Sequence, residues 1–260
     1  MEGDSLSAAS ITDNLETHFI GQRVIFYPRL ASTMEVAKRE AARRGAAEGT
    51  VIVADEQTAG KGRLKRIWLS PKGNIALSVI LYPDVAYLTS LIMVASLAVV
   101  HSIETVTGLK SQVKWPNDVL INGRKVCGIL IESDVRGNIV DYAIIGIGVN
   151  VNLRLYDFPD ILSTATSLSH ELGREVSRLD VIRQLLVEIE RLYLTLQAGG
   201  SIYEEWRDSL VTLGRRVRVK SGKTIYDGIA ESVTIDGSLL LRRSDGSLSK
   251  IVSGDVTLRE

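Results

Sequence analysis

The chain has 260 residues, and 45% of them are hydrophobic, which is enough to bury the core of one large domain or of one domain with a small appendage. Its 31 lysine and arginine residues balance its 31 aspartate and glutamate residues. A net charge of zero argues against general nucleic-acid binding, because no overall positive field attracts a polyanion.

Cysteine, histidine and apolar patterns exclude further classes of protein. Cys127 is the only cysteine, which excludes an intramolecular disulfide and fits a reducing compartment. His18, His101 and His170 lack the spacing of a metal site. The N-terminus carries acids and no apolar core, so it is not a signal peptide, and residues 91–100 are too short to span a bilayer and indicate a buried helix. We therefore expect a cytoplasmic protein without a membrane partner.

The first predicted elements follow from short apolar runs. Residues 1–14 are small and polar, and we expect them to be flexible, with no room for a DNA-binding helix-turn-helix before a first strand at 24–28. Ser32 and Glu35 have the spacing of a capping box, which predicts a helix through Arg44.

Residues 55–73, called the basic loop from here on, connect predicted core strands at 50–54 and 74–81. The loop contains five cations and three glycines: Lys61, Arg63, Lys65, Arg66 and Lys72, with Gly60, Gly62 and Gly73. Glycine lets peptide N–H groups approach a ligand closely, arginine can bind phosphate or carboxylate in a bidentate manner, and Trp68 offers an apolar wall. The loop therefore predicts an anion-binding site, with a solvated basic loop as the alternative.

Two familiar phosphate-binding motifs are excluded. The GKGRLK segment has no third glycine for the dinucleotide fingerprint. The GKT segment at 222–224 has Val217 where a P-loop requires glycine. A nucleotide bound at the basic loop would require another design.

Residues 113–133 contain two predicted turns, Pro116-Asn117-Asp118 and the hairpin signal Asn122-Gly123. The two turns are expected to place Lys114 and Lys125 on neighbouring strands. Cations at both edges of an apolar strand pair suggest a pocket with charged lips. A surface position for each lysine is the alternative.

The remaining segments are predicted as scaffold. They comprise an apolar helix at 87–107, a strand at 139–152, a helix start after 165–168 and a short helix at 203–210. A helix with a core stripe is formed by Ile182, Leu185, Leu186, Ile189, Tyr193 and Leu196. After Gly214 the pattern changes to short alternating strands at 215–220, 224–232, 238–243 and 247–252, which predicts a small β-barrel.

Four segments, in this order and spacing, resemble biotin protein ligase. They are Ser32-Thr33, Gln57 through Trp68, Lys114-Trp115-Pro116-Asn117-Asp118 followed by Lys125 and Gly128-Ile129-Leu130, and residues 146–152, GIGVNVN. The resemblance extends from residue 21 or so to the C-terminus and is greatest to short archaeal-type ligases without a DNA-binding domain.

The resemblance implies an α+β fold. A mixed β-sheet catalytic domain flanked by helices, of the class II synthetase/biotin ligase-like type, would span 1–212. A small C-terminal SH3-like β-barrel would follow at 213–260 and help to close over ATP or the carrier protein.

The activity implied by the resemblance is ATP-dependent ligation of biotin to biotin carboxyl carrier protein. Biotin and ATP would form biotinyl-5'-AMP and pyrophosphate, and biotin would pass to a lysine on a carrier domain of a carboxylase or decarboxylase. Mg²⁺ would bridge phosphate oxygens, with its protein ligands unknown. The expected assembly is a homodimer without nucleic acid.

Site residues carried over by resemblance fall into three groups. Biotin would contact Ser32, Thr33, Gln57, Lys61, Gly62, Arg63, Trp68 and Lys125. The nucleotide would contact Lys61, Arg63, Trp68, Lys114, Asn117, Asp118 and Asn150. The catalytic charge-stabilising residues would be Arg63, Lys114 and Lys125, because a carboxylate and a triphosphate repel each other unless cations separate them.

Two positions depart from the family pattern. Met34 stands where the family has asparagine, so an amide contact is lost. Lys61 replaces the first arginine of the loop and keeps the charge without the bidentate fork. Two other functions compete with biotin ligation: lipoate or octanoate ligation, and a biotin-sensing or nucleic-acid-binding regulator without catalysis. The complete set of adenylate-binding cations favours a ligase over the regulator.

Overall fold

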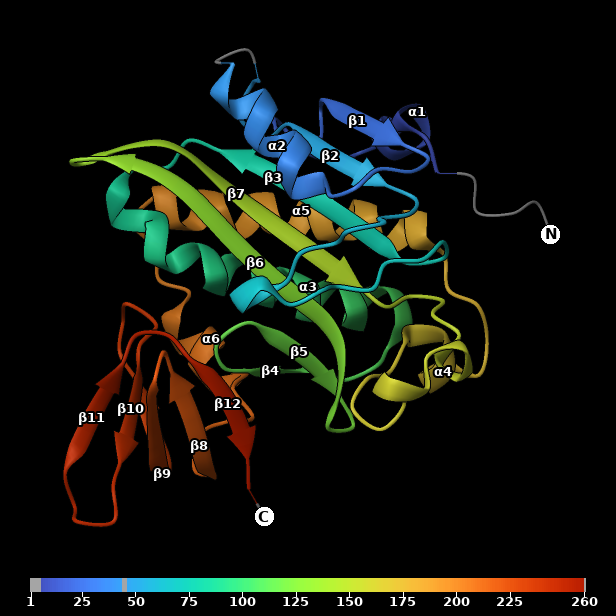
Figure 1. Cartoon of the computed structure of the whole chain (residues 1–260). Helices are drawn as coiled ribbons and strands as arrows, with labels where there is room; N and C mark the ends of the chain where they lie inside the picture. The colour runs from blue at the N-terminus through green and yellow to red at the C-terminus, as the bar shows by residue number, and fades with distance from the viewer. Residues whose placement is uncertain (1–5, 44–45, 260) are drawn as a thin grey trace.

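The computed structural model describes residues 6–43 and 46–259, which form two β-sheets with helices around the first (Figure 1). The larger sheet has seven strands in the order β1-β2-β3-β7-β6-β5-β4. These strands are β1 (Val24–Tyr27), β2 (Val51–Ala54), β3 (Ile75–Leu81), β4 (Gln112–Lys114), β5 (Asp118–Ile121), β6 (Arg124–Arg136) and β7 (Ile139–Val149). Only β1 and β2 run parallel, with helix α2 as their crossover, so the sheet is mixed as predicted.

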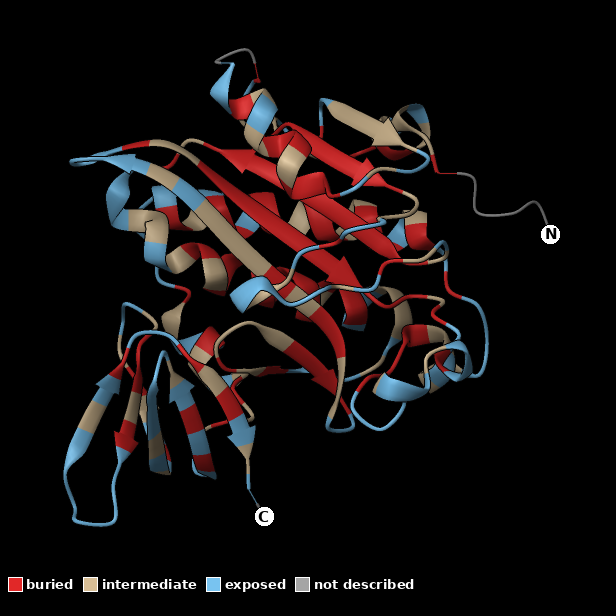
Figure 2. Ribbon diagram, viewed as in Figure 1, coloured by how far each residue is buried: buried red, intermediate tan, exposed pale blue. Residues whose placement is uncertain are grey.

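Helices cover both faces of the larger sheet. They are α1 (Ala8–Thr12), α2 (Thr33–Ala42), α3 (Leu91–Thr107), α4 (Leu168–Leu172), α5 (Arg178–Gln197) and α6 (Tyr203–Asp208). Helices α3 and α5 lie on one face, while α2 and the basic loop lie on the other (Figure 1). Every residue of β3 is buried, because this central strand is covered from both sides (Figure 2).

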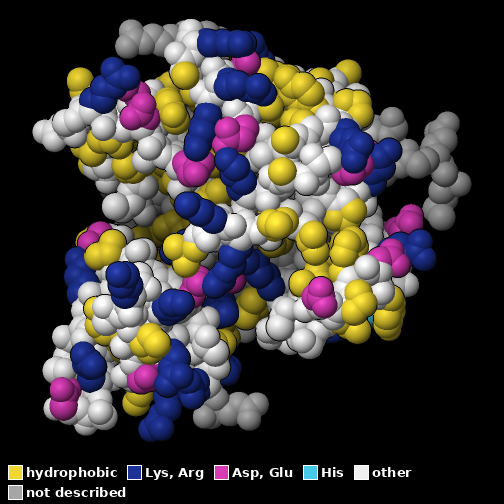
Figure 3. All heavy atoms as spheres, viewed as in Figure 1, with side chains coloured by type: hydrophobic (Ala, Val, Ile, Leu, Met, Phe, Trp, Pro, Cys, Tyr) yellow, Lys and Arg dark blue, Asp and Glu magenta, His cyan; other side chains and the backbone are white. Residues whose placement is uncertain are grey.

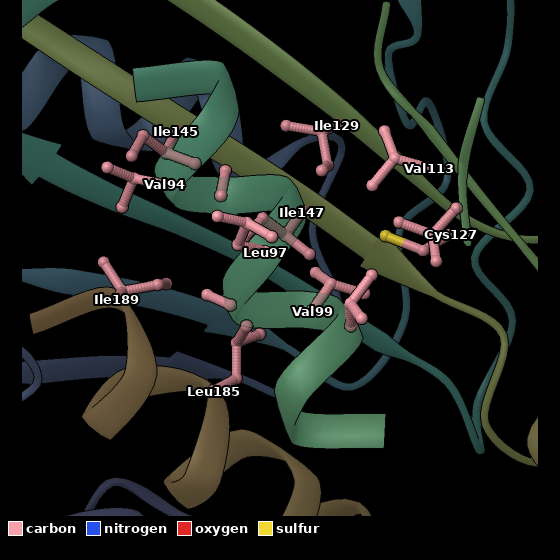
Figure 4. Packing of buried hydrophobic residues seen from close by; sticks show 14 of the residues in the cluster. Val94, Leu97, Val99, Val113, Cys127, Ile129, Ile145, Ile147, Leu185 and Ile189 are labelled. Carbon is pink, nitrogen blue, oxygen red and sulfur yellow. The ribbon is translucent and has the colours of Figure 1, made fainter. Parts of the chain in front are cut away.

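The main core lies between the sheet and helices α3 and α5. Val94 and Leu97 of α3 pack against Ile145 and Ile147 of β7, with Leu185 of α5 nearby (Figure 4). All six residues of the stripe predicted on α5 are buried, which confirms it. Cys127 belongs to the same core and is fully buried, as predicted.

The apolar helix is shorter than predicted. The segment Val85–Thr107 is long and apolar enough to cross a membrane by composition alone. In the fold it consists of a 3₁₀ segment, Val85–Ser90, followed by α3, whose buried face packs into the core. Gly108 ends α3 in the left-handed conformation with φ 74°, which glycine adopts at little cost.

The smaller sheet has five antiparallel strands in the order β11-β10-β9-β8-β12. They are β8 (Arg216–Ser221), β9 (Thr224–Val233), β10 (Leu239–Arg242), β11 (Leu248–Ile251) and β12 (Asp255–Leu258). Four of these were predicted, and β12 was not. The predicted barrel is not closed. Among the described residues β11 and β12 are each paired on one side only, so the sheet is open.

The N-terminal region differs from the prediction. Residues 8–12 form α1, whose Ile11 is buried and whose Ser7 and Ser10 make a reciprocal capping box. The flexible segment expected at 1–14 is therefore wrong from residue 6 onwards, where Leu6 is buried in the core, and residues 1–5 lie outside the described part of the chain. The predicted end of α2 at Arg44 also lies outside it.

Candidate active site

A cavity of about 130 Å³ lies between the start of α2, the basic loop and strands β6 and β7. Eight residues expected at the biotin site all line it: Ser32, Thr33, Gln57, Lys61, Gly62, Arg63, Trp68 and Lys125. In Figure 1 the basic loop, with its short 3₁₀ segment Arg63–Lys65, crosses the face of the larger sheet opposite α3 and α5. The lining residues place strands β6 and β7 on one side of this cavity and the loop on the other.

The floor of the first cavity is made by glycines of β6 and β7. Gly128 and Gly148 are register partners, and a Cβ on Gly128 would lie 3.0 Å from Cζ3 of Trp68. A Cβ on Gly148 would overlap the Trp68 indole nitrogen. Gly146 has the same role beneath Met34, where a Cβ would lie 2.5 Å from Sδ. These positions lack side chains because the indole and the thioether occupy the space above them.

One end of the first cavity carries neutral hydrogen-bonding groups. The backbone N–H and the hydroxyl of Thr33 donate to Oε1 of Gln57 at 2.8 and 3.1 Å. The Ser78 hydroxyl donates to Oγ1 of Thr33 at 2.9 Å. Ser32 is buried, and its hydroxyl has no partner among the described residues. A buried hydroxyl without a hydrogen-bond partner lowers the stability of the fold, and a ligand that hydrogen-bonds to it would remove this cost.

The predicted capping box at α2 is wrong. Ser32 is the N-cap residue of α2, but its side chain makes no capping hydrogen bond. Glu35 turns instead to the basic loop and pairs with Lys61. The Lys61 ammonium lowers the pKa of Glu35. The first turn of α2 therefore supports the site through Glu35 and leaves Ser32 free for a ligand.

Most cations of the site have partners within the chain. Lys125 lies 2.6 Å from Asp118, and Arg66 pairs with Asp255 of β12. Arg63 donates to Oδ1 of Asn117 at 2.8 Å and to the carbonyl of Gly254 at 3.3 Å. Figure 3 shows lysine and arginine side chains gathered where the larger body meets the smaller sheet. An anionic substrate would compete with these internal acceptors.

Lys114 differs from the other cations. It has no ion pair among the described residues, and burial lowers its pKa, an effect that the nearby Asp118 carboxylate opposes. Burial also lowers the pKa of Arg63, although a guanidinium remains charged. A partly desolvated ammonium without a partner interacts strongly with an arriving anion.

The two turns predicted that Lys114 and Lys125 lie on neighbouring strands, and this prediction is wrong. Lys114 belongs to β4 and Lys125 to β6, and β5 runs between them. Asp118, the first residue of β5, pairs in register with both Lys114 and Gly128. The carboxylate of β5 thus separates two ammonium groups that would otherwise repel each other.

A second cavity, of about 610 Å³, continues from the first. It contains Lys114 and Asn150, and it shares Trp68, Asp118 and Lys125 with the first cavity. Its apolar lining includes Leu120, Leu153, Ile161, Val256 and Leu258. Lys61, Arg63 and Asn117 line only the first cavity, so the residues expected at the nucleotide are divided between the two.

The structure adds two site residues that the sequence did not reveal. Asp255 lines the first cavity, and Gly254 accepts from Arg63, yet both belong to the end of the chain. The unpredicted strand β12 brings them there. No group of three or more His, Cys, Asp or Glu side chains able to hold a metal occurs within residues 6–43 and 46–259.

Comparison with known proteins identifies the family. Residues 26–150 match the Biotin/lipoate A/B protein ligase family, and residues 212–259 match the Biotin protein ligase C terminal domain. The chain is 39% identical over 259 residues to the Bifunctional ligase/repressor BirA of Bacillus subtilis, covering 97% of this chain and 79% of the relative. It is 33% identical over 207 residues to a biotin--[acetyl-CoA-carboxylase] ligase of Paracoccus denitrificans, covering 75% of this chain and 85% of the relative.

A solved structure has the same fold. The biotin protein ligase from Aquifex aeolicus, in complex with biotin and ATP, superimposes with a TM-score of 0.78 at 29% identity. The match covers 92% of this chain and 99% of that one. Together with the sequence matches, this likeness shows that the chain belongs to the biotin protein ligase family.

Proposed function

We propose that the chain joins biotin to ATP as biotinyl-5'-AMP, releases pyrophosphate and transfers biotin to a lysine of a biotin carboxyl carrier protein domain. The observation that carries this proposal is the shared wall of the two cavities. Trp68, Asp118 and Lys125 line both, so a carboxylic acid in the first cavity and a nucleotide in the second would meet at Lys125. The structure of the Aquifex aeolicus relative contains both biotin and ATP, which supports binding of both substrates by this fold.

In this scheme the first cavity holds biotin along its length. The uncharged ureido ring would occupy the neutral end of the cavity. There Ser32 offers an unpaired hydroxyl, Thr33 a hydroxyl and Gln57 a side-chain amide. The apolar rings would lie against the glycine floor and Trp68. The carboxylate would then reach Lys125, which would exchange Asp118 for the substrate.

The second cavity is proposed to hold ATP. Its apolar lining suits the adenine base, and Asn150 lies in the same cavity. Lys114 would neutralise the carboxylate and the α-phosphate as they approach, which is electrostatic stabilisation by a preorganised charge. No side-chain nucleophile is needed. Cys127 is unsuited to that role because burial raises the pKa of its thiol.

Mg²⁺ is proposed to accompany ATP. Asn117 and Asp118 line the first cavity with side-chain oxygens, and oxygen is the ligand that Mg²⁺ prefers. Because no cluster of three acidic or histidine side chains occurs in the described segments, most of its ligands would be phosphate oxygens and water. The ion would screen the phosphate charge while Lys114 and Arg63 bind the remaining oxygens.

The cellular context is also a proposal. The partner would be a carrier domain of a carboxylase or decarboxylase, in the cytoplasm, with no nucleic acid involved. The catalytic unit would span 1–212 and the C-terminal unit 213–260. We expect a homodimer, and a monomeric mass at micromolar concentration in light scattering would contradict this.

ATP–pyrophosphate exchange by the purified chain with Mg²⁺ tests the function. Parallel reactions contain biotin, lipoate or no acid. We expect exchange with biotin alone. Exchange with lipoate alone would transfer the chain to the lipoate branch of the matched family, and no exchange with either acid would contradict carboxylate activation.

A further inference from the structure

The two ends of the basic loop leave the larger sheet side by side. The loop begins at Asp55, directly after β2, and ends at Gly73, before β3. Ala54 and Ala76 are register partners in the antiparallel pair β2 and β3. The loop therefore has a narrow neck, and any group that joins the two sides of this neck restrains the whole loop.

Arg178 joins the two sides. It is the first residue of α5, and its side chain is only 8% exposed. Its Nη1 atom lies 2.6 Å from Oδ1 of Asp55, on the outgoing side. The same atom lies 3.3 Å from the carbonyl oxygen of Asn74, on the returning side. One guanidinium thus contacts Asp55, the first residue of the loop, and Asn74, the residue directly after the end of the loop.

The returning side is also tied to the second cavity. The side-chain oxygen of Asn74 accepts from the N–H of Val151 at 3.0 Å, and the carbonyl of Gly73 accepts from the N–H of Asn152 at 2.9 Å. Asn150 stands in the sequence between the end of β7 and the two donors, Val151 and Asn152, and it lines the second cavity. The neck therefore joins the loop that covers the first cavity to the segment that borders the second.

We propose that Arg178 is a positioning residue, which holds the basic loop over the adenylate by clamping its neck through Asp55 and the Asn74 carbonyl. The Arg178 side chain is buried and the Asp55 side chain is 21% exposed, so the carboxylate that remains after loss of Arg178 is partly desolvated, which is unfavourable. Loss of Arg178 would leave the Asp55 carboxylate unpaired at the neck, and the chain there would open to hydrate it. The position of the loop cations would then be lost. The role in catalysis rests on the proposed function.

The plain alternative is that Arg178 only stabilises the fold. Arg183 provides a matched control, because it is an arginine of the same helix. Its guanidinium donates to the carbonyl of Ser10 in α1, and Arg183 lines neither cavity. A purely structural role predicts the same rate of loop cleavage and the same labelling selectivity for Arg178→Met and Arg183→Met, when each variant is measured below its own unfolding temperature.

Limited trypsin digestion tests the clamp without requiring any activity. Lys61, Lys65 and Arg66 are exposed sites for trypsin within the basic loop. We expect Arg178→Met and Asp55→Asn each to accelerate cleavage in the loop about tenfold, because cleavage follows the population of the open loop. Arg183→Met should leave the cleavage rate unchanged. Equal loop cleavage in Arg178→Met, Asp55→Asn and the parent chain would overturn the clamp.

Labelling selectivity tests the consequence for the reaction. With biotin, ATP and a mixture of proteins, Arg178→Met should label bystander lysines about tenfold more than the parent does, because adenylate escapes from a loosened loop. Arg178→Lys keeps the charge and should restore part of the selectivity. The double variant Arg178→Met/Asp55→Asn should be no worse than Arg178→Met alone, since Arg178→Met already removes the contact with Asp55 as well as the contact with the Asn74 carbonyl.

The outcomes separate this inference from the proposed function. Activity in the parent with unchanged selectivity in Arg178→Met would overturn the positioning role alone. No biotin-dependent exchange in the parent would overturn the proposed function, and the cleavage rates would still decide whether the neck is clamped. Should Arg178→Met fail to fold, Asp55→Asn and Arg178→Lys carry both measurements.

Discussion

The cations of the site come from two regions that are held in different ways. The strand cations, Lys114 and Lys125, extend from β4 and β6 of the larger sheet, whose backbone is fixed by ladder hydrogen bonds. The loop cations, Lys61, Arg63 and Arg66, extend from the basic loop, where Arg63 begins a short 3₁₀ segment and no β-strand fixes the backbone. They are held by contacts with Glu35, Asn117 and Asp255, the first residue of β12.

This difference separates two tasks. A charge that must meet a developing transition state has to be fixed before the substrates arrive, and a strand fixes it. A charge that covers an intermediate must be able to exchange its internal partner for the ligand, and exposed ion pairs permit this because each contributes little. Strand cations should therefore govern the rate of activation, and loop cations should govern retention of the adenylate.

Substitution of the strand cation Lys114 should have the largest effect. Lys114→Met is expected to lower the rate of biotin-dependent exchange about 10³-fold, because it removes a preorganised charge from the reacting centre. Stopped-flow or exchange kinetics at saturating biotin and ATP measure this. Lys110→Met is the control, since Lys110 is exposed and paired with Glu104. A loss below tenfold would contradict the task assigned to strand cations.

The pH dependence of activation should report the same residue. Burial lowers the pKa of Lys114, so this ammonium loses its proton at a lower pH than an ordinary lysine. The protonated form is the active one, and the exchange rate should fall as pH rises through that lowered pKa. In Lys114→Arg the alkaline limb should move to higher pH, because arginine stays charged. An unchanged alkaline limb in this variant would assign it to another group.

A steric test addresses the contact between the loop and the strand floor. Gly148→Ala should raise the KM for biotin about 100-fold, because the new Cβ would displace Trp68 from its place on the floor. Trp68→Ala in the same chain should make the glycine substitution milder. Steady-state kinetics of the unaltered chain, the two single variants and the double variant measure how far the two substitutions are coupled in their effect on the KM for biotin. Additive effects would show that Trp68 does not rest on Gly148 during the reaction.

A loop cation should affect retention more than rate. Arg63→Gly is expected to increase labelling of bystander lysines about tenfold, because the contacts of Arg63 with Asn117 and Gly254 no longer hold the loop. Lys65→Gly is the control, since Lys65 has φ 62°, which suits glycine, and lines neither cavity. Unchanged selectivity in a mixed-protein assay would contradict the task assigned to loop cations.

A group remote from both regions should have the smallest effect. His101 of α3 lies 3.0 Å from Glu188 and 2.8 Å from Glu205, and the hydrogen bond with Glu188 raises its pKa despite burial and the nearby Arg191. The protonated form is stabilised in the fold. The contribution, about 1 kcal/mol, is fully present below pH 6.5 or so and is lost as pH rises through the raised pKa.

Urea unfolding of the parent and His101→Gln at pH 6 and pH 9 measures this contribution. The variant should be less stable at pH 6 and nearly equal to the parent at pH 9. Activation and selectivity should be unchanged in the variant at pH 8. A pH-independent difference in stability would assign the effect of His101 to packing instead.

Local patterns predicted most of the scaffold. Apolar runs located the strands on both sides of the basic loop, and the Asn122-Gly123 turn joins β5 to β6 as expected, with both residues at positive φ. The charge pattern located the loop itself. These features depend on residues that are close in sequence, so a local pattern is sufficient to find them.

Contacts between distant segments were not predictable in the same way. The spacing of Ser32 and Glu35 fits a capping box, but Lys61 competes for Glu35 only because the loop folds back over α2. Asp255 carries no local signal at all. It reaches Arg66 because β12 pairs with β8 and thereby brings the end of the chain to the cavity.

The sequence by itself determined the order of most elements and the position of the basic loop, and its resemblance to a family identified about half of the residues that line the first cavity. Only the tertiary structure decided which charges are paired, which hydroxyl is left free and which residue clamps the loop. Arg178 and Asp55 are far apart in the chain, and their contact exists because α5, which packs against the sheet, begins beside the neck of the loop. Periodicity reports the neighbours of a residue along the chain, whereas pairing of buried charges depends on neighbours in space.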